Sequence, residues 1–196
     1  MNQNLSATAP PAPAASELDV EVALLHQQCA AELLTYALSF ARAHDAASDA
    51  VQEVFLRYFI ERSYGRVIEH PRAWLYRVLR NYALDRLDKA SIKREVAAEN
   101  AADVPDGNCG PEEKLRQSQM AKQMLALLSP REVECLKLRA DGLSYDEMGE
   151  VLGIRAGTVS SLLTRVHNKL RAESQRNREY RAGALEALCF LMTGGD

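Results

Sequence analysis

Apolar residues recur every three or four positions along most of the chain, which is the spacing of amphipathic α-helices. The first such stretch covers residues 17–43. Its apolar row consists of Leu18, Val22, Leu25, Cys29, Leu33, Tyr36 and Phe40. A second helix is expected from Asp45, a residue type that caps helix N-termini, to Gly65, and a third from Pro71, which suits a first helical turn. Together these helices predict one shared core.

The apolar pattern is lost between residues 89 and 111. Five residues in this segment discourage regular structure: Asp106, Gly107, Asn108, Gly110 and Pro111. We therefore predict a flexible linker over residues 95–111. The helical pattern returns after it, and a helix is expected from Glu112 to Leu128.

Two helix starts in the second half have complete sequence signals. Ser129-Pro130-Arg131-Glu132 and Ser144-Tyr145-Asp146-Glu147 are both capping boxes, in which serine and glutamate satisfy each other's backbone N–H groups. The first of these helices is expected to stop at Gly142, and the second is short. Gly153 permits a tight turn, after which the last helix is expected over Thr158–Arg171. The inward positions of that helix are Val159, Leu162, Val166 and Leu170.

No stretch alternates apolar and polar residues as a half-buried strand does, so the predicted fold class is all-α. We expect two helical domains joined by the flexible linker. The predicted divisions are a disordered tail (1–16), a first domain (17–94), the linker (95–111), a second domain (112–172) and a C-terminal extension (173–196).

The net charge of −3 argues by itself against a nucleic-acid partner, but the distribution of charge changes that reading. Residues 62–94 hold 9 basic and 3 acidic side chains, and residues 155–181 hold 7 basic and 2 acidic ones. Clustered basic residues are what phosphate binding requires, although such a run is more often a solvated helix face.

The second domain has the sequence features of a helix-turn-helix: a short helix, a glycine turn and a longer helix with a polar, basic outer face. The second helix of such a motif enters the DNA major groove. The residues expected to reach DNA are Arg155, Thr158, Ser160, Ser161, Thr164, Arg165 and Lys169. An ordinary helical hairpin with a polar outer face is the alternative.

Nothing in the sequence indicates an enzyme, a cofactor or a metal site. The four histidines lie in unrelated contexts, and neither a nucleophile elbow nor a phosphate-binding glycine loop is present. The four cysteines have no C-x-x-C spacing and are expected as reduced, mostly buried thiols. No apolar run reaches the roughly 18 residues that span a bilayer, and the N-terminus has no secretory-signal pattern. A cytoplasmic protein without membrane insertion is expected.

The segment from Leu128 to Arg171 resembles region 4 of the extracytoplasmic-function sigma factors, a two-domain group of the sigma-70 family. The first domain agrees independently. Asp49-Ala-Val-Gln-Glu-Val-Phe55 resembles region 2.2 of that family, and Pro71–Asn81 resembles regions 2.3 and 2.4. The resemblance covers roughly residues 20–94 and 112–172, in the family's order.

This resemblance implies a sigma factor that binds RNA polymerase core and directs promoter recognition and transcription initiation. Asp49, Gln52 and Glu53 share one helix face and would bind the clamp helices of the polymerase β′ subunit. The second domain would meet the β flap and read the minus-thirty-five element, and the acidic linker would pass near the active-site cleft. An anti-sigma protein is a further partner that the family allows.

Regions 2.3 and 2.4 of this family melt and read the minus-ten element, where aromatic faces stack on bases and arginines bind phosphates. The residues implied for this task are Arg66, Arg72, Tyr76, Arg77, Arg80, Asn81 and Arg86. The loop over residues 63–70 corresponds to the family's base-capturing loop. Trp74 is expected in the core rather than against DNA.

A LuxR-type regulator is the leading alternative, because its helix-turn-helix resembles residues 128–170 almost as closely. Such a protein would need alternating strands and helices upstream, and this alternative leaves Asp49–Phe55 unexplained.

The sequence leaves the role of two features open. Gly149 is a helix glycine where relatives prefer alanine. The apolar residues 183–192 predict either a short helix docked on the protein itself or a partner or autoinhibitory site.

Overall fold

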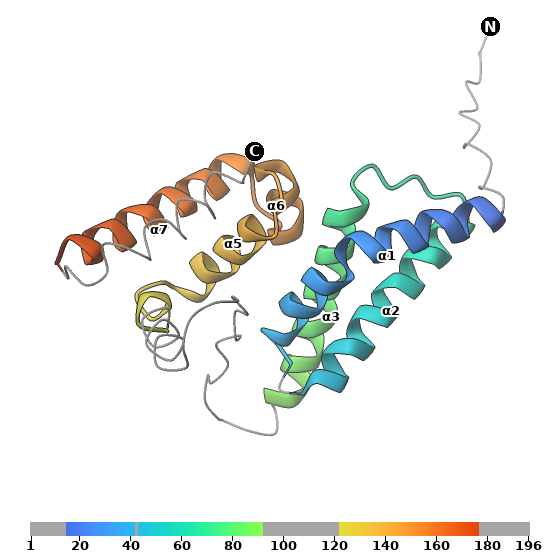
Figure 1. Ribbon diagram of the computed structural model, residues 1–196, viewed down its shortest axis with the longest axis horizontal. Coiled ribbons are helices and arrows are strands. Elements are labelled where there is room, and N and C mark those ends of the chain that lie inside the picture. Colours follow the sequence, from blue (N-terminus) through green and yellow to red (C-terminus); the bar gives the residue numbers. More distant parts are fainter. Residues whose placement is uncertain (1–14, 42, 92–121, 177–196) are drawn as a thin grey trace, which may run out of the picture. The chain divides into compact units, whose positions relative to one another are not determined.

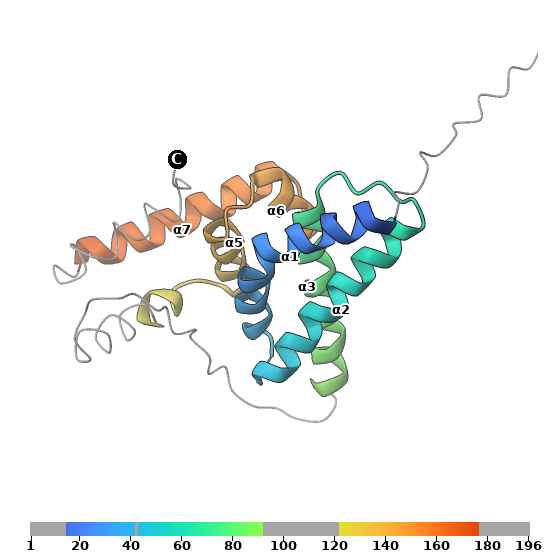
Figure 2. The same cartoon turned by 45° about the vertical axis from the view of Figure 1, so that its right-hand side comes forward.

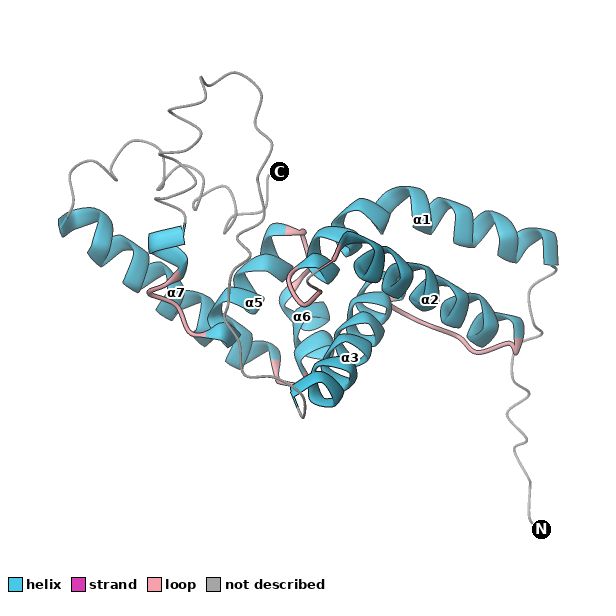
Figure 3. Ribbon diagram, turned by 90° about the horizontal axis from the view of Figure 1, so that it is seen from below, coloured by secondary structure: helices cyan, strands magenta, loops and turns pink. Residues whose placement is uncertain are grey.

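The computed structural model describes residues 15–41, 43–91 and 122–176, and these form two compact units within Met1–Lys93 and Arg94–Asp196. Each unit is described by itself. Every regular element among the described residues is a helix (Figure 3), which confirms the all-α fold with two helical domains. The predicted linker and the apolar residues 183–192 lie outside the described residues.

The first unit is a bundle of three helices, α1 (Ala15–Leu38), α2 (His44–Ser63) and α3 (Pro71–Ser91). Helices α1 and α2 lie side by side, and α3 packs against both (Figures 1 and 2). The largest fully buried side chains of this unit are Leu33, Tyr36, Val54, Tyr58, Leu75, Tyr76 and Leu79. Tyrosines from all three helices therefore meet in one core. The apolar pattern predicted the shared core, but it did not predict Tyr76 as a member of it.

The two ends of α2 are set by different means. The helix begins at His44 after Ala43, whose extended backbone (φ −126°, ψ 139°) makes no side-chain cap hydrogen bond. The prediction that Asp45 caps this helix is wrong, because Asp45 already lies in the first turn, where its charge favours the helix dipole. At the other end Gly65 takes a left-handed conformation (φ 78°). Its N–H donates to the Arg62 carbonyl oxygen at 2.9 Å, which closes the helix in a Schellman motif.

The second unit contains α5 (Pro130–Ala140), α6 (Tyr145–Leu152) and α7 (Ala156–Arg176). Both predicted capping boxes form, with Ser129 paired to Glu132 and Ser144 to Glu147. The last helix is longer at both ends than the predicted Thr158–Arg171. The helix expected through Leu128 ends earlier, since only residues 122–125 of that stretch are helical among those described.

The core of the second unit brings α7 against the other helices. The fully buried side chains of this core include Leu138, Leu143, Met148, Val159 and Leu163. A further cluster packs Met124 and Leu128, which precede α5, against Leu136 of α5 and against Val166 and Leu170 of α7. The recognition helix predicted from the sequence is therefore held along its whole inner side.

Candidate nucleic-acid interface

Helices α6 and α7 are joined by the tight turn that a helix-turn-helix needs. Gly153 ends α6 in a left-handed conformation (φ 66°), and the Ile154 N–H donates to the Gly149 carbonyl oxygen at 3.0 Å. A Cβ on Gly149 would stand 2.7 Å from the Ile154 carbonyl oxygen. Gly149 is thus required by the close approach of the turn, which explains the glycine that sequence reasoning left open.

One side of α7 is buried and the other is exposed. Val159, Leu162, Val166 and Leu170, predicted to face inward, are all buried. The seven side chains predicted to reach DNA are all exposed: Arg155, Thr158, Ser160, Ser161, Thr164, Arg165 and Lys169. The Ser161 hydroxyl donates to the Gly157 carbonyl oxygen at 2.9 Å, and the Thr164 hydroxyl donates to that of Ser160 at 2.9 Å. These hydroxyl oxygens keep lone pairs with which they can accept hydrogen bonds.

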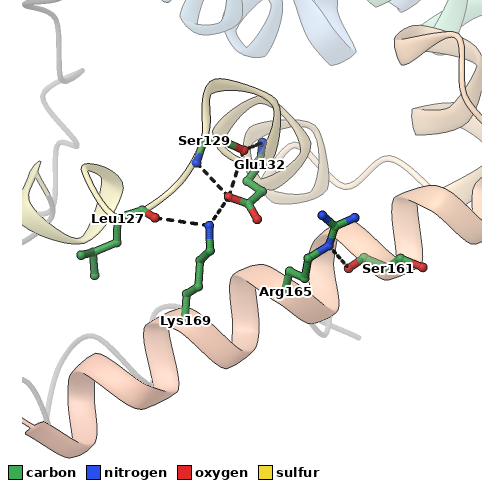
Figure 4. Close-up of polar contacts among 6 residues, drawn as sticks. All are labelled: Leu127, Ser129, Glu132, Ser161, Arg165 and Lys169. Carbon is green, nitrogen blue, oxygen red and sulfur yellow. Dashed lines mark hydrogen bonds and ion pairs between the residues drawn. The ribbon is translucent and has the colours of Figure 1, made fainter.

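Lys169 differs from the other exposed residues of α7, because its ammonium bonds to groups outside the helix (Figure 4). Its Nζ lies 2.7 Å from Oε2 of Glu132 and 3.4 Å from the Leu127 carbonyl oxygen. Glu132 is only 3 % exposed. The bond from Lys169, followed by the Ser129 N–H, lowers the pKa of Glu132 from its ordinary value of 4.5 to about 2.

On the first unit, the face of α2 opposite the core carries the three residues predicted to bind polymerase. Asp49 and Gln52 are exposed, and Glu53 is half-buried and accepts a 2.7 Å hydrogen bond from Nε of Arg57. Sequence reasoning missed two apolar neighbours on this face, Leu56 and Ile60, which are 54 % and 41 % exposed. The signal that could have found them is helical spacing: Leu56 is four residues after Gln52 and three after Glu53, and Ile60 is four residues after Leu56.

The basic residues predicted to meet the minus-ten element are spread over the α2–α3 loop and α3. Arg77 and Asn81, one turn apart on α3, are exposed, and Arg80 is half-buried. In the loop, Tyr64 is 85 % exposed, and the exposed Arg66 forms a 2.6 Å ion pair with Glu61. Arg86 lies in α3, but its side chain is outside the described ones.

Tyr76 is fully buried in the bundle, where its ring lies 5.1 Å from that of Tyr36. A base cannot stack on a ring that has no accessible face, so the prediction that Tyr76 contacts DNA is wrong. Arg72 is half-buried, and its guanidinium is bonded to Glu32 of α1 at 2.5 Å, so part of its charge is used within the bundle. Trp74, expected in the core, is half-buried, with its ring edge-on to that of Tyr58 at 5.6 Å.

A second network, which sequence reasoning missed, connects α1 to the α2–α3 loop. The Arg62 guanidinium donates two 2.9 Å hydrogen bonds to the Glu21 carboxylate and a third, also 2.9 Å, to the Arg66 carbonyl oxygen. The buried Tyr58 hydroxyl donates to the same carboxylate. Arg62 lowers the pKa of Glu21, and Glu21 raises that of Arg62. The network therefore ties the loop to the bundle.

The described residues show neither a metal-binding cluster nor a membrane-spanning helix. They contain no group of three or more His, Cys, Asp or Glu side chains placed to hold a metal ion. Cys29 and Cys135 are buried free thiols, and burial raises the pKa of each to about 11. None of the described helices is long and apolar enough to cross a membrane.

Sequence comparison matches a different family to each unit. The family model for sigma-70 region 2 matches residues 25–92, which include most of α1 and all of α2 and α3. The model for bacterial regulatory proteins of the luxR family matches residues 126–178, which include the helix-turn-helix. A luxR match at this place agrees with the similarity of the two kinds of helix-turn-helix.

Three sigma factors are similar to about two thirds of the chain. The ECF RNA polymerase sigma factor SigE of Mycolicibacterium smegmatis is 33 % identical over 145 residues, which is 70 % of this chain and 54 % of that relative. EcfG of Rhodopseudomonas palustris is 28 % identical over 142 residues, and SigW of Bacillus subtilis is 29 % identical over 140. These alignments cover 71 % and 65 % of this chain, and 77 % and 74 % of the two relatives.

The chain spans about half the length of the first of these relatives. Each alignment is longer than either unit alone, so the similarity extends over parts of both. Because the region 2 match and these relatives point to sigma factors, we interpret the luxR match as similarity of the helix-turn-helix motif alone. The chain is similar to sigma factors of the sigma-70 family, in its extracytoplasmic-function group.

Proposed function

We propose that this protein is a sigma factor: it binds core bacterial RNA polymerase and directs it to promoters, with no catalytic chemistry of its own. The observation behind this proposal is that a region 2 bundle and a helix-turn-helix unit each expose a surface suited to one half of that task. The cytoplasm, where polymerase meets DNA, is the proposed location.

The outward face of α2 is the proposed polymerase-docking surface, and it consists of Asp49, Gln52, Glu53, Leu56 and Ile60. Its polar residues can pair with charged groups on the β′ clamp helices, which sets orientation. The exposed Leu56 and Ile60 supply apolar area whose burial stabilises the complex, at about 25 cal/mol per Å². A stripe with both kinds of residue is typical of a protein–protein interface.

The α2–α3 loop and the exposed side of α3 form the proposed minus-ten surface. Arg66, Arg77, Arg80 and Arg86 would bind phosphates of the opened strand, and Asn81 would contact it beside Arg77. With Tyr76 in the core, Tyr64 is the exposed aromatic residue nearest to these arginines in the sequence, and we assign base stacking to it. Arg72 would attract the DNA phosphates more weakly than the other arginines, because its ion pair with Glu32 partly balances its charge.

Helix α7 is the proposed reader of the minus-thirty-five element in the major groove. Its exposed residues Thr158, Ser160, Ser161 and Thr164 can bond to base edges or phosphates, and Arg155 and Arg165 bring positive charge. The same unit would meet the β flap of the polymerase. An anti-sigma protein that holds the factor inactive stays a prediction from the family.

The luxR-family match at residues 126–178 favours one other function, a free-standing regulator that binds DNA without polymerase. This alternative gives no role to the region 2 bundle or to its exposed α2 face.

In vitro transcription separates the two functions. Core polymerase with the protein should start transcripts at fixed positions on the host's genomic fragments, and core polymerase alone should not. Arg165→Ala should weaken promoter binding and leave core binding intact, whereas Glu53→Lys should weaken core binding first. DNA binding by the protein with no effect on the start sites of core polymerase would favour the regulator.

A further inference from the structure

Lys169 joins three segments of the second unit. It projects from α7, and its ammonium donates to the Leu127 carbonyl oxygen before α5 and to the carboxylate of Glu132 in the first turn of α5 (Figure 4). Glu132 stands 37 residues earlier in the chain. The bond therefore fixes one side of the recognition helix to the N-terminus of another helix.

The carboxylate that Lys169 meets is already positioned. Oε2 of Glu132 accepts from the Ser129 N–H at 2.8 Å and from the Ser129 hydroxyl at 2.9 Å, in addition to Lys169 at 2.7 Å. Because Glu132 is 3 % exposed, its charge has little water to stabilise it and depends on these donors. Moving Lys169 to a DNA phosphate would take one of the three donors away from a buried charge.

Arg165 provides the contrast within the same helix. It lies one turn before Lys169 and is also exposed, but its Nε donates only a 3.4 Å hydrogen bond to the Ser161 carbonyl oxygen of its own helix. Figure 4 shows the Arg165 side chain beside α7, without a dashed line to another segment. Arg165 can therefore turn to DNA without breaking a contact between helices, and Lys169 cannot.

We propose that Lys169 is a positioning residue: it sets the orientation of α7 through Glu132 and does not itself contact DNA. This inference rests on the proposed reading of DNA by α7, and it replaces the DNA-contact role that the sequence predicted for Lys169. The base-reading side chains, such as Ser161 and Thr164, enter the groove at the angle that this bond maintains.

Salt dependence distinguishes the two roles of a lysine. Each phosphate that a protein cation neutralises releases counterions, and the slope of log K against log salt concentration changes by about 0.9 per phosphate. Loss of a phosphate contact therefore makes the slope shallower by about one. Loss of a positioning contact lowers affinity for the preferred sequence and leaves the slope unchanged.

The experiment uses the full-length chain assembled with core polymerase, and two probes of equal length: a duplex that the wild-type complex selects from a randomised pool, and an unselected one. The variants are Lys169→Met, Glu132→Gln, their combination, the conservative Lys169→Arg, and Arg165→Met as the matched exposed cation. Thermal unfolding first establishes a temperature at which every variant is folded.

Lys169→Met and Glu132→Gln are each expected to weaken binding to the selected duplex by about tenfold, as one lost base-pair contact does. Neither should change the salt slope, the double variant should lose no more than either single one, and Lys169→Arg should restore binding. Arg165→Met should make the slope shallower by about one on both duplexes.

The inference is overturned if Lys169→Met makes the slope shallower while Glu132→Gln binds normally, because Lys169 would then be a phosphate contact. It is also overturned if both variants bind the selected duplex as the wild type does. Failure of the chain to assemble with core polymerase would count against the proposed function instead. The same variants would then be compared on DNA with the chain alone.

Discussion

Gly149 lies within α6, four residues before the Gly153 turn toward α7, and the Ile154 carbonyl oxygen approaches it closely. An alanine Cβ here would stand 2.7 Å from that oxygen, a distance that forces the turn to shift. Gly157, in the first turn of α7, has no such neighbour: apart from its adjacent residues and the backbone of its own helix, nothing in the described chain lies within 4 Å of where its Cβ would be. Gly157 is therefore a matched control for an alanine substitution at Gly149.

We predict that Gly149→Ala lowers the free energy of unfolding by about 1–3 kcal/mol, the usual cost of overpacking. Gly157→Ala should leave it unchanged or raise it by up to about 1 kcal/mol, because alanine favours the helix. Urea unfolding of both variants measures the difference. Equal effects at the two positions would show that the turn does not restrict Gly149.

Glu132 gives a prediction for pH dependence. Its pKa in the folded protein, about 2, is below the ordinary value of 4.5, so the ionised carboxylate stabilises the fold. That contribution is complete above about pH 4.5 and is lost as the pH falls toward 2.

The wild type should therefore exceed Glu132→Gln in free energy of unfolding by a constant amount from pH 7 to pH 5, and the excess should shrink below pH 4.5. Guanidinium unfolding at a series of pH values measures both proteins. An excess that did not change between pH 5 and pH 3 would contradict the assignment of the low pKa to Glu132.

Side-chain partners are the part of the site that the sequence could not predict. The amphipathic pattern correctly placed Lys169 among the exposed residues, but no local signal shows that Glu132 takes its ammonium. Tyr76 failed for a related reason, because tyrosine suits both a core and a stacking surface and only the packing of three helices decides between them.

At the scale of elements, helix ends with a local signal were the most predictable. Both capping boxes form because serine and glutamate complete them within four residues. The start of α2 was misplaced because Ala43, which precedes the helix, provides no side-chain cap, so no local cap signal marks where the helix starts. The residues missed on α2, Leu56 and Ile60, are exposed apolar side chains that a pattern for cores does not reveal.

The loop between α2 and α3 depends on Arg62, which holds the Arg66 carbonyl oxygen and Glu21 of α1 at once. We predict that Arg62→Met loosens this loop and makes trypsin cleave faster after the exposed Arg66, since cleavage requires local opening. Arg57→Met is the matched control, because the contacts of Arg57, to Glu53 of its own helix and to the Tyr82 ring of α3, do not involve the loop or α1.

Limited proteolysis followed by mass spectrometry gives the rate of cleavage after Arg66 in each variant. Cleavage that is faster in Arg62→Met than in Arg57→Met would support the role of Arg62 in holding the loop against the bundle. Equal rates in both would mean that the Schellman motif at Gly65 holds the loop without Arg62.

At the scale of the whole molecule, we assign the two contacts to separate units: polymerase docking to the α2 face and upstream DNA binding to α7. The first unit offers an internal comparison for the docking half of that claim. Leu24 on α1 and Leu56 on α2 are the same residue type at nearly equal exposure, 53 % and 54 %, on different helices of the bundle. Only Leu56 lies beside Gln52 and Glu53, the polar residues of the proposed docking surface.

The most direct test is the affinity of full-length protein for core bacterial RNA polymerase, measured for the wild type, Leu56→Glu and Leu24→Glu. Both changes add one negative charge to an exposed apolar site, so they affect solubility and folding alike. We expect Leu56→Glu to weaken binding by about tenfold or more, as loss of a central interface residue does, and Leu24→Glu to bind as the wild type does. Equal affinity of the two variants, or a folded wild type that does not bind core polymerase, would contradict this assignment.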